Sequence, residues 1–301
     1  MSIFTGSGVA ICTPFDKENK FNPNVYEKLI KFHFENHTDA IISCGTTGEV
    51  STLTTDEHVD VVKTAVESAK KYQNEFKRKM PIVGGGGGND TAKCCEIGKK
   101  LQQVGADALM FVSPYYNKTS QKGLVTHYSK IASSVDLPII VYNVASRTGI
   151  NISPKTMEEL SKIPNIVAVK EASGDISQIC EVFERCGDGF DVYSGNDDHI
   201  VPVLSMGGKG VISTIANIMP NIVHRITAEF FNGKLEESRT LQIELLPLIR
   251  LLFSDVNPMP VKYALTLKGF DVGLCRLPLV EIEDSLKEAL KKEFERIDKN
   301  A

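Results

Sequence analysis

The feature that most constrains the fold is a regular alternation of short apolar runs with longer segments of helical periodicity. Eight runs of four to six residues are rich in β-branched and small apolar side chains, and a segment of helical spacing follows each one. Strands that alternate with helices pair side by side in parallel sheets. Eight such units within about 230 residues favour an α/β fold of the closed (β/α)8 type, a TIM barrel, over an open sheet.

The boundaries of these units can be read from the pattern. The predicted strands are 8–13, 40–43, 81–84, 108–112, 138–142, 166–170, 190–194 and 210–213. The predicted helices that follow them are 23–37, 56–72, 91–104, 122–134, 154–162, 176–186, 199–206 and 221–232. Beyond Gly233 only helical periodicity remains, over 235–253, 260–268 and 282–297. We therefore predict a barrel at 1–233 and a C-terminal helical extension at 234–301.

Composition narrows the functional class. Charged residues make up 24% of the chain with a net charge of −4, and no apolar run approaches the length of a membrane span. We expect no membrane or nucleic-acid partner. The seven cysteines are odd in number, are scattered and include no C-x-x-C pair, and no signal peptide is visible, so we expect reduced thiols and a cytoplasmic location.

A lysine at the end of a predicted strand is the first candidate for chemistry. The run from Ile166 ends at Lys170, before Ser173 and Gly174 break the strand. Alternation along a strand is expected to place Ile166, Ala168 and Lys170 on one face and to point Glu171 away from Lys170. A lysine amine in an apolar pocket loses solvation of its charged form, and the neutral amine is the nucleophile in Schiff-base chemistry. The alternative is a lysine that extends into water.

Three other strand ends carry unusual residues. Gly45-Thr46-Thr47-Gly48-Glu49 could bring backbone N–H groups close to a carboxylate, or could be an ordinary polar turn. Tyr115 and Tyr116 lie on the predicted loop after the fourth strand, and a pair of aromatics on a loop is typical of a subunit or ligand contact. Tyr142 ends a strand, and Arg147 beyond it could bind a carboxylate through its two-pronged guanidinium or lie in solvent.

The sequence gives only weak support for a metal site or a phosphate site. Asp197, Asp198 and His199 are consecutive and do not converge, so helix capping is favoured there. His33 and His37 lack the glutamate of a zinc-binding H-E-x-x-H pattern. The glycine run 84–88 lacks the lysine of a phosphate-binding loop and predicts a flexible turn. We predict no metal and no cofactor.

Taken together, these stretches resemble the dihydrodipicolinate synthase family of class I pyruvate aldolases. The resemblance rests on 45–49, 115–117, 142–149, 169–175, 207–213 and 276–279, and so extends along the whole chain. It implies a lyase that condenses pyruvate with aspartate semialdehyde through an imine on Lys170. It also implies a proton relay of Tyr142, Thr46 and a Tyr116 from a neighbouring subunit, and hence a homo-oligomer, either dimer or tetramer. By the same resemblance Thr46 and Thr47 hold the pyruvate carboxylate, Arg147 holds the semialdehyde carboxylate, and Ile212 is a further substrate-binding residue.

Two alternatives stay open. Sialic acid lyases and 2-keto-3-deoxy sugar-acid aldolases share the lysine and the tyrosine but accept polyhydroxy aldehydes, and the Ser146-Arg147-Thr148-Gly149 stretch looks like the synthase pattern. A barrel that binds a keto acid as a regulator without turnover is a third possibility.

The chain departs from the family pattern at several positions. Ala145 replaces a usual proline, which could loosen the loop before Arg147, and the glycine run replaces a Thr-Gly-Ser/Ala pattern. At the lysine effector site of feedback-inhibited members His58, Asn89 and Tyr115 match, whereas Lys93, Val50 and Thr55 do not. A lysine at position 93 repels the ammonium of an L-lysine effector, so the resemblance predicts weak or absent feedback.

Overall fold

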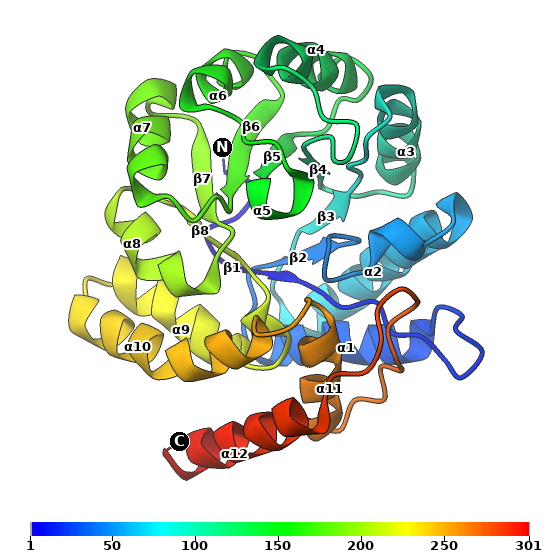
Figure 1. The fold of residues 1–301 in the computed structure, drawn as a ribbon, viewed down its shortest axis with the longest axis vertical. Coiled ribbons are helices and arrows are strands. Elements are labelled where there is room, and N and C mark those ends of the chain that lie inside the picture. Colours follow the sequence, from blue (N-terminus) through cyan, green and yellow to red (C-terminus); the bar gives the residue numbers. More distant parts are fainter. Residues whose placement is uncertain (1, 301) are drawn as a thin grey trace.

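The fold is a closed barrel of eight parallel strands in chain order, as the sequence predicts (Figure 1). A computed structural model describes residues 2–300. The strands are β1 (Gly6–Ala10), β2 (Ala40–Ser43), β3 (Ile82–Gly85), β4 (Ala108–Val112), β5 (Ile139–Asn143), β6 (Ile166–Glu171), β7 (Asp191–Ser194) and β8 (Gly210–Ser213). β1 pairs with both β2 and β8, which closes the ring and leaves no sheet edge exposed.

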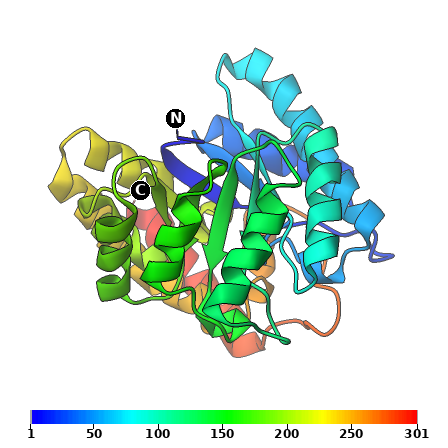
Figure 2. The same cartoon turned by 90° about the horizontal axis from the view of Figure 1, so that it is seen from above.

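The helices surround the strands (Figures 1 and 2). They are α1 (Pro23–Glu35), α2 (Thr55–Phe76), α3 (Thr91–Gln103), α4 (Gln121–Ala132), α5 (Ala145–Thr148), α6 (Pro154–Ser161), α7 (Ile176–Cys186), α8 (Ile200–Ser205), α9 (Pro220–Phe231), α10 (Leu235–Leu252), α11 (Met259–Leu267) and α12 (Asp284–Asn300), with short 3-10 turns η1 (Val50–Thr52), η2 (Asp197–His199) and η3 (Ile215–Asn217). Side chains cap many of them; Thr54 and Glu57, for example, form a reciprocal capping box at the start of α2. The eleven predicted helices are all present, but α5 is an addition, and β1 lies earlier in the sequence than predicted.

The buried side chains form two layers. An inner cluster inside the strands includes Ile42, Met110, Tyr142, Ala168 and Ile212. A larger outer cluster fills the space between strands and helices. The two layers follow from the alternation of side chains along strands that are buried on both faces.

The predicted faces of β6 are partly wrong. Ile139 of β5 pairs with Ile166, but Ile140 pairs with Ala168, so β6 contains one extra residue at this point. Ile166 consequently belongs to the outer cluster, whereas Ala168 belongs to the inner one. Beyond this bulge the alternation is regular and leaves Lys170 on the same face as Ala168.

The C-terminal helices lie outside the ring of strands, beside α1 and α9 (Figure 1). Phe270, after α11, packs against Phe32 of α1 with ring centroids 5.2 Å apart. On α12, which matches the helix predicted over 282–297, the apolar side chains of Leu290, Phe294 and Ile297 are buried. Within residues 2–300, no helix combines the length and the apolarity that a membrane crossing requires.

The glycine run 84–88 packs closely between neighbouring strands. A Cβ atom on Gly85 would lie 2.3 Å from the carbonyl oxygen of Cys44, and one on Gly87 would lie 2.3 Å from the amide nitrogen of Val112. Gly85 belongs to β3, and the Gly86 N–H donates to the carbonyl of Met110. None of the five has a positive φ, so Gly85 and Gly87 serve close approach of neighbouring backbone rather than an unusual backbone conformation.

Candidate active site

Lys170 and Tyr142 lie side by side at the carboxyl ends of β6 and β5. They are directly paired in the strand register, and the Lys170 Nζ lies 4.4 Å from the centroid of the Tyr142 ring. Lys170 is only 5% exposed. The amine is therefore held against an aromatic face, and the alternative of a lysine extending into bulk water is wrong. Carboxyl ends of barrel strands are where catalytic side chains of this architecture gather.

The outward-facing neighbours of this pair form a polar clamp that sequence reasoning missed. Asn143 and Glu171 are also paired in register, and the Asn143 amide donates to both carboxylate oxygens of Glu171 at 3.0–3.1 Å. The Ser173 N–H donates to Glu171 as well. Burial raises the pKa of Glu171, and these hydrogen bonds oppose that rise. Glu171 points away from Lys170, as predicted, and the clamp fixes the strand ends that carry Tyr142 and Lys170.

The Gly45–Glu49 turn follows β2 with two free donors. Gly48 N–H donates to the Gly45 carbonyl and Glu49 N–H to the Thr46 carbonyl, whereas the N–H groups of Thr46 and Thr47 have no acceptor among the described residues. Adjacent free N–H groups at a strand end are suited to bind a carboxylate. The Thr47 hydroxyl accepts a hydrogen bond from the Asn257 side chain at 2.9 Å, which leaves its own proton available.

Arg147 lies on the short helix α5, which crosses the barrel opening in Figure 1. Arg147 is exposed as a residue. The one hydrogen bond of its guanidinium among the described residues is a long, partly buried 3.5 Å contact to the carbonyl of Asn257. Asn257 therefore contacts both Thr47 and Arg147.

Ala145 is the first residue of α5, and the turn is closed by hydrogen bonds from Thr148 to Val144 and from Gly149 to Ala145, so the backbone here is regular without proline.

Tyr116 is not brought to Lys170 within this chain. It lies on the loop after β4 with a positive φ of 67° and an exposed fraction of 90%. An aromatic ring so fully exposed is typical of a contact with another molecule. Tyr115 beside it is about one-third exposed.

Two further residues lie near the carboxyl ends of β8 and β7. Ile212, fully buried, belongs to the inner cluster with Tyr142. Asp197 does not cap its own turn, so that prediction is wrong; its carboxylate accepts the N–H groups of Thr214 and Ile215, at the start of η3. Burial raises the pKa of Asp197, opposed by these bonds, by Ser213 and by the positive charge of Lys170. No group of three His, Cys, Asp or Glu side chains suited to a metal occurs in the described residues; the absence of a metal stays a prediction.

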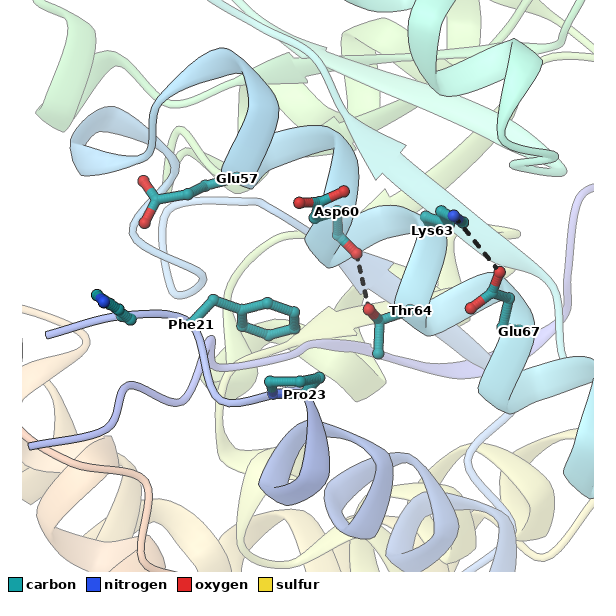
Figure 3. A pocket seen from close by; sticks show the side chains of 8 residues that line it. Phe21, Pro23, Glu57, Asp60, Lys63, Thr64 and Glu67 are labelled. Carbon is teal, nitrogen blue, oxygen red and sulfur yellow. Dashed lines mark hydrogen bonds and ion pairs between the residues drawn. The ribbon is translucent and has the colours of Figure 1, made fainter. Parts of the chain in front are cut away.

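A surface groove elsewhere on the molecule has no part in this arrangement. Figure 3 shows it between Phe21 and Pro23 on one side and α2 on the other. No predicted site residue is among its lining residues, which are Lys20, Phe21, Pro23, Glu57, Asp60, Lys63, Thr64 and Glu67. Two of its charged side chains, Lys63 and Glu67, form an ion pair with each other.

Comparison with known proteins identifies the family. Residues 3–297 match the model of the dihydrodipicolinate synthetase family. The chain belongs to this family. A 4-hydroxy-tetrahydrodipicolinate synthase of Caldicellulosiruptor saccharolyticus is 51% identical over 292 residues, which cover 97% of this chain and 96% of that protein.

Solved structures of dihydrodipicolinate synthetase family members agree with the fold. The chloride-inhibited dihydrodipicolinate synthase of Acinetobacter baumannii, complexed with pyruvate, superposes with a TM-score of 0.92 at 37% identity, over 97% of this chain and 98% of that one. The enzyme of Cyanidioschyzon merolae with lysine bound has a TM-score of 0.92 at 35% identity, with 98% of each chain covered.

Proposed function

We propose that this chain is a 4-hydroxy-tetrahydrodipicolinate synthase, a lyase that condenses pyruvate with L-aspartate 4-semialdehyde in lysine and diaminopimelate biosynthesis. The observation that carries the proposal is the buried Lys170 amine beside the Tyr142 ring at the mouth of the barrel. Family membership and the names of the full-length relatives support it. We infer a cytoplasmic enzyme that uses neither metal nor cofactor.

In this proposal Lys170 attacks the ketone carbon of pyruvate. A carbon–nitrogen bond forms, water leaves, and the protonated imine withdraws electrons from the neighbouring methyl group. Loss of a methyl proton gives an enamine, whose carbon attacks the aldehyde carbon of the second substrate. The aldehyde oxygen takes up a proton and becomes a hydroxyl group, and the imine on Lys170 forms again. The amino group of that substrate then displaces Lys170 from the imine carbon as the product ring closes.

The other predicted residues have binding and proton-transfer roles. The free N–H groups of Thr46 and Thr47 hold the pyruvate carboxylate, and pyruvate is the ligand named for the similar Acinetobacter structure. Tyr142 and the Thr46 hydroxyl carry protons, together with a Tyr116 from a neighbouring subunit. Because Tyr116 is exposed in a single chain, this relay is complete only in a homo-oligomer.

Turnover with two classes of aldehyde tests the proposal. Purified protein with pyruvate should consume aspartate semialdehyde at least about a hundredfold more efficiently than a polyhydroxy aldehyde such as N-acetylmannosamine. A preference for the sugar would contradict the synthase assignment and favour a sialate or sugar-acid aldolase. An imine with pyruvate but no turnover of either aldehyde would indicate a keto-acid-binding regulator.

Arg147→Ala should impair the second substrate selectively. Loss of a charge-assisted, bidentate contact to the semialdehyde carboxylate should raise the KM for aspartate semialdehyde by about 10- to 100-fold. The KM for pyruvate should stay within about twofold of wild type, because its carboxylate is bound at another strand end. Arg185→Ala, which breaks an exposed ion pair with Glu181 on α7, is the matched control. Equal increases in both KM values would rule out this division of labour.

L-Lysine should inhibit weakly or not at all. Lys93, in the first turn of α3, places a positive charge where the effector ammonium needs a carboxylate. His58 is buried, and its ring nitrogen is 2.6 Å from the Gly85 carbonyl; burial lowers its pKa to about 4, so it is neutral at pH 7 and occupied as a donor. Initial rates over a lysine titration measure this. Half-inhibition below about 1 mM L-lysine would contradict the prediction. In that case Lys93 would not oppose the effector, and Lys93→Glu should leave the inhibition unchanged.

A further inference from the structure

We infer that the buried ion pair between Glu49 and Lys262 positions the Gly45–Glu49 turn for binding of the substrate carboxylate. This inference rests on the proposed function, because it assigns a consequence for pyruvate binding. It concerns two residues that do not contact substrate in the proposal. Glu49 ends the turn after β2, and Lys262 lies on α11 in the C-terminal region.

The ion pair is well shielded from water. The Lys262 Nζ lies 2.6 Å from the Glu49 Oε1, and the two side chains are 3% and 2% exposed. Lys262 also donates to the carbonyl of Leu274 at 3.1 Å and lies 4.2 Å from the centroid of the Phe15 ring. An exposed ion pair would contribute little to the stability of the fold. Breaking a buried pair is costly, because it leaves a buried charge without a partner.

Glu49 is a position where the backbone needs support. Its φ is 53°, in the left-handed region that residues with a side chain rarely adopt. The second carboxylate oxygen accepts the Arg276 N–H at 2.9 Å, so two segments of the C-terminal region hold one carboxylate. Such a conformation persists when the surrounding contacts over-determine it.

The strained residue is hydrogen-bonded to the predicted binding residue. The Glu49 N–H donates to the carbonyl of Thr46, which fixes the orientation of the peptide group between Thr46 and Thr47. That peptide group carries one of the two free N–H donors. Release of the Glu49 carboxylate is therefore expected to let this donor move away from the substrate carboxylate, and displacement of about 1 Å is costly for binding geometry. The rest of the turn is held independently, since the Thr13 hydroxyl donates to the Gly48 carbonyl.

The test compares three variants with wild type. Lys262→Met removes the cation and keeps the length of the stem. Glu49→Gln/Lys262→Met removes both charges. This double variant should fold even if Lys262→Met, which leaves a buried carboxylate without its partner, does not. Lys291→Met is the matched control, because it breaks an exposed ion pair with Glu288 on α12. Hydrogen exchange followed by mass spectrometry reports on the turn, and borohydride trapping at increasing pyruvate reports on the half-saturating concentration.

In Lys262→Met and in Glu49→Gln/Lys262→Met the turn peptide should exchange about tenfold faster, while peptides from β4 stay as in wild type. The half-saturating pyruvate concentration should rise about tenfold, with the final yield of adduct unchanged and the Lys291 control unaltered. The inference would be overturned if hydrogen exchange in the turn peptide were unchanged, or if exchange rose equally across the whole barrel. It would also be overturned if the turn exchanged faster while the half-saturating pyruvate concentration stayed as in wild type. If wild type itself formed no adduct, the proposed function would fail, and turn exchange alone would decide whether the ion pair holds the turn.

Discussion

Lys170→Ala should lower kcat by a factor on the order of 10³ or more, because the covalent route through an imine disappears with the amine. A factor of 10³ corresponds to about 4 kcal/mol of activation free energy. No other lysine is predicted to replace it; Lys262, also buried, is committed to Glu49 and the Leu274 carbonyl. Steady-state rates with both substrates saturating measure the effect.

A second substitution separates loss of the amine from loss of packing. Lys170→Met keeps an unbranched apolar stem beside the Tyr142 ring and should be as inactive as the alanine variant. Thermal unfolding of both variants should stay cooperative. Activity of the methionine variant within about tenfold of wild type would contradict a covalent role for Lys170.

Tyr142→Phe should lower kcat by about 10²- to 10⁴-fold, the range expected for loss of one proton-transfer group. The substitution keeps the ring that lies 4.4 Å from the Lys170 amine, so the environment of the amine changes little. Pyruvate should still form a trappable adduct, although more slowly. Single-turnover rates measured with and without the aldehyde distinguish a defect in proton transfer from a defect in binding.

Tyr128→Phe provides the matched control. Tyr128 is a fully buried tyrosine of α4 whose hydroxyl donates to the Phe111 carbonyl at 3.0 Å, outside the candidate site. Its loss should reduce stability without lowering kcat. If both tyrosine variants lost activity to the same extent, packing rather than proton transfer would explain the effect at Tyr142.

The barrel and its lysine are predictable from the sequence because they depend on local patterns. An apolar run that ends in a lysine and then breaks at glycine places Lys170 at a strand end whatever its neighbours are. The face of Ile166 is not predictable in this way, because the extra residue in β6 is a property of its pairing with β5. Helix α5, with four residues, is too short to show a helical period.

The long-range polar contacts of the site are the part that sequence reasoning misses. Asn143 and Glu171 each follow a predicted catalytic residue by one position, and this equal offset is a signal that could have suggested their pairing. Lys262 sits in an apolar helical segment with no local carboxylate, and Glu49 is distant in the chain, so only the folded structure joins them. The role of Tyr116 depends on a second subunit, which a single chain does not contain.

The most direct test of the central claim is the mass of the protein after borohydride reduction in the presence of pyruvate. If Lys170 forms the imine, wild type should gain about 72 Da, the mass of one pyruvate with water lost and two hydrogens added. Peptide mapping should locate the added mass on Lys170, and the alanine variant should gain none. An adduct on another lysine, or no adduct at saturating pyruvate, would contradict the assignment of Lys170 as the nucleophile.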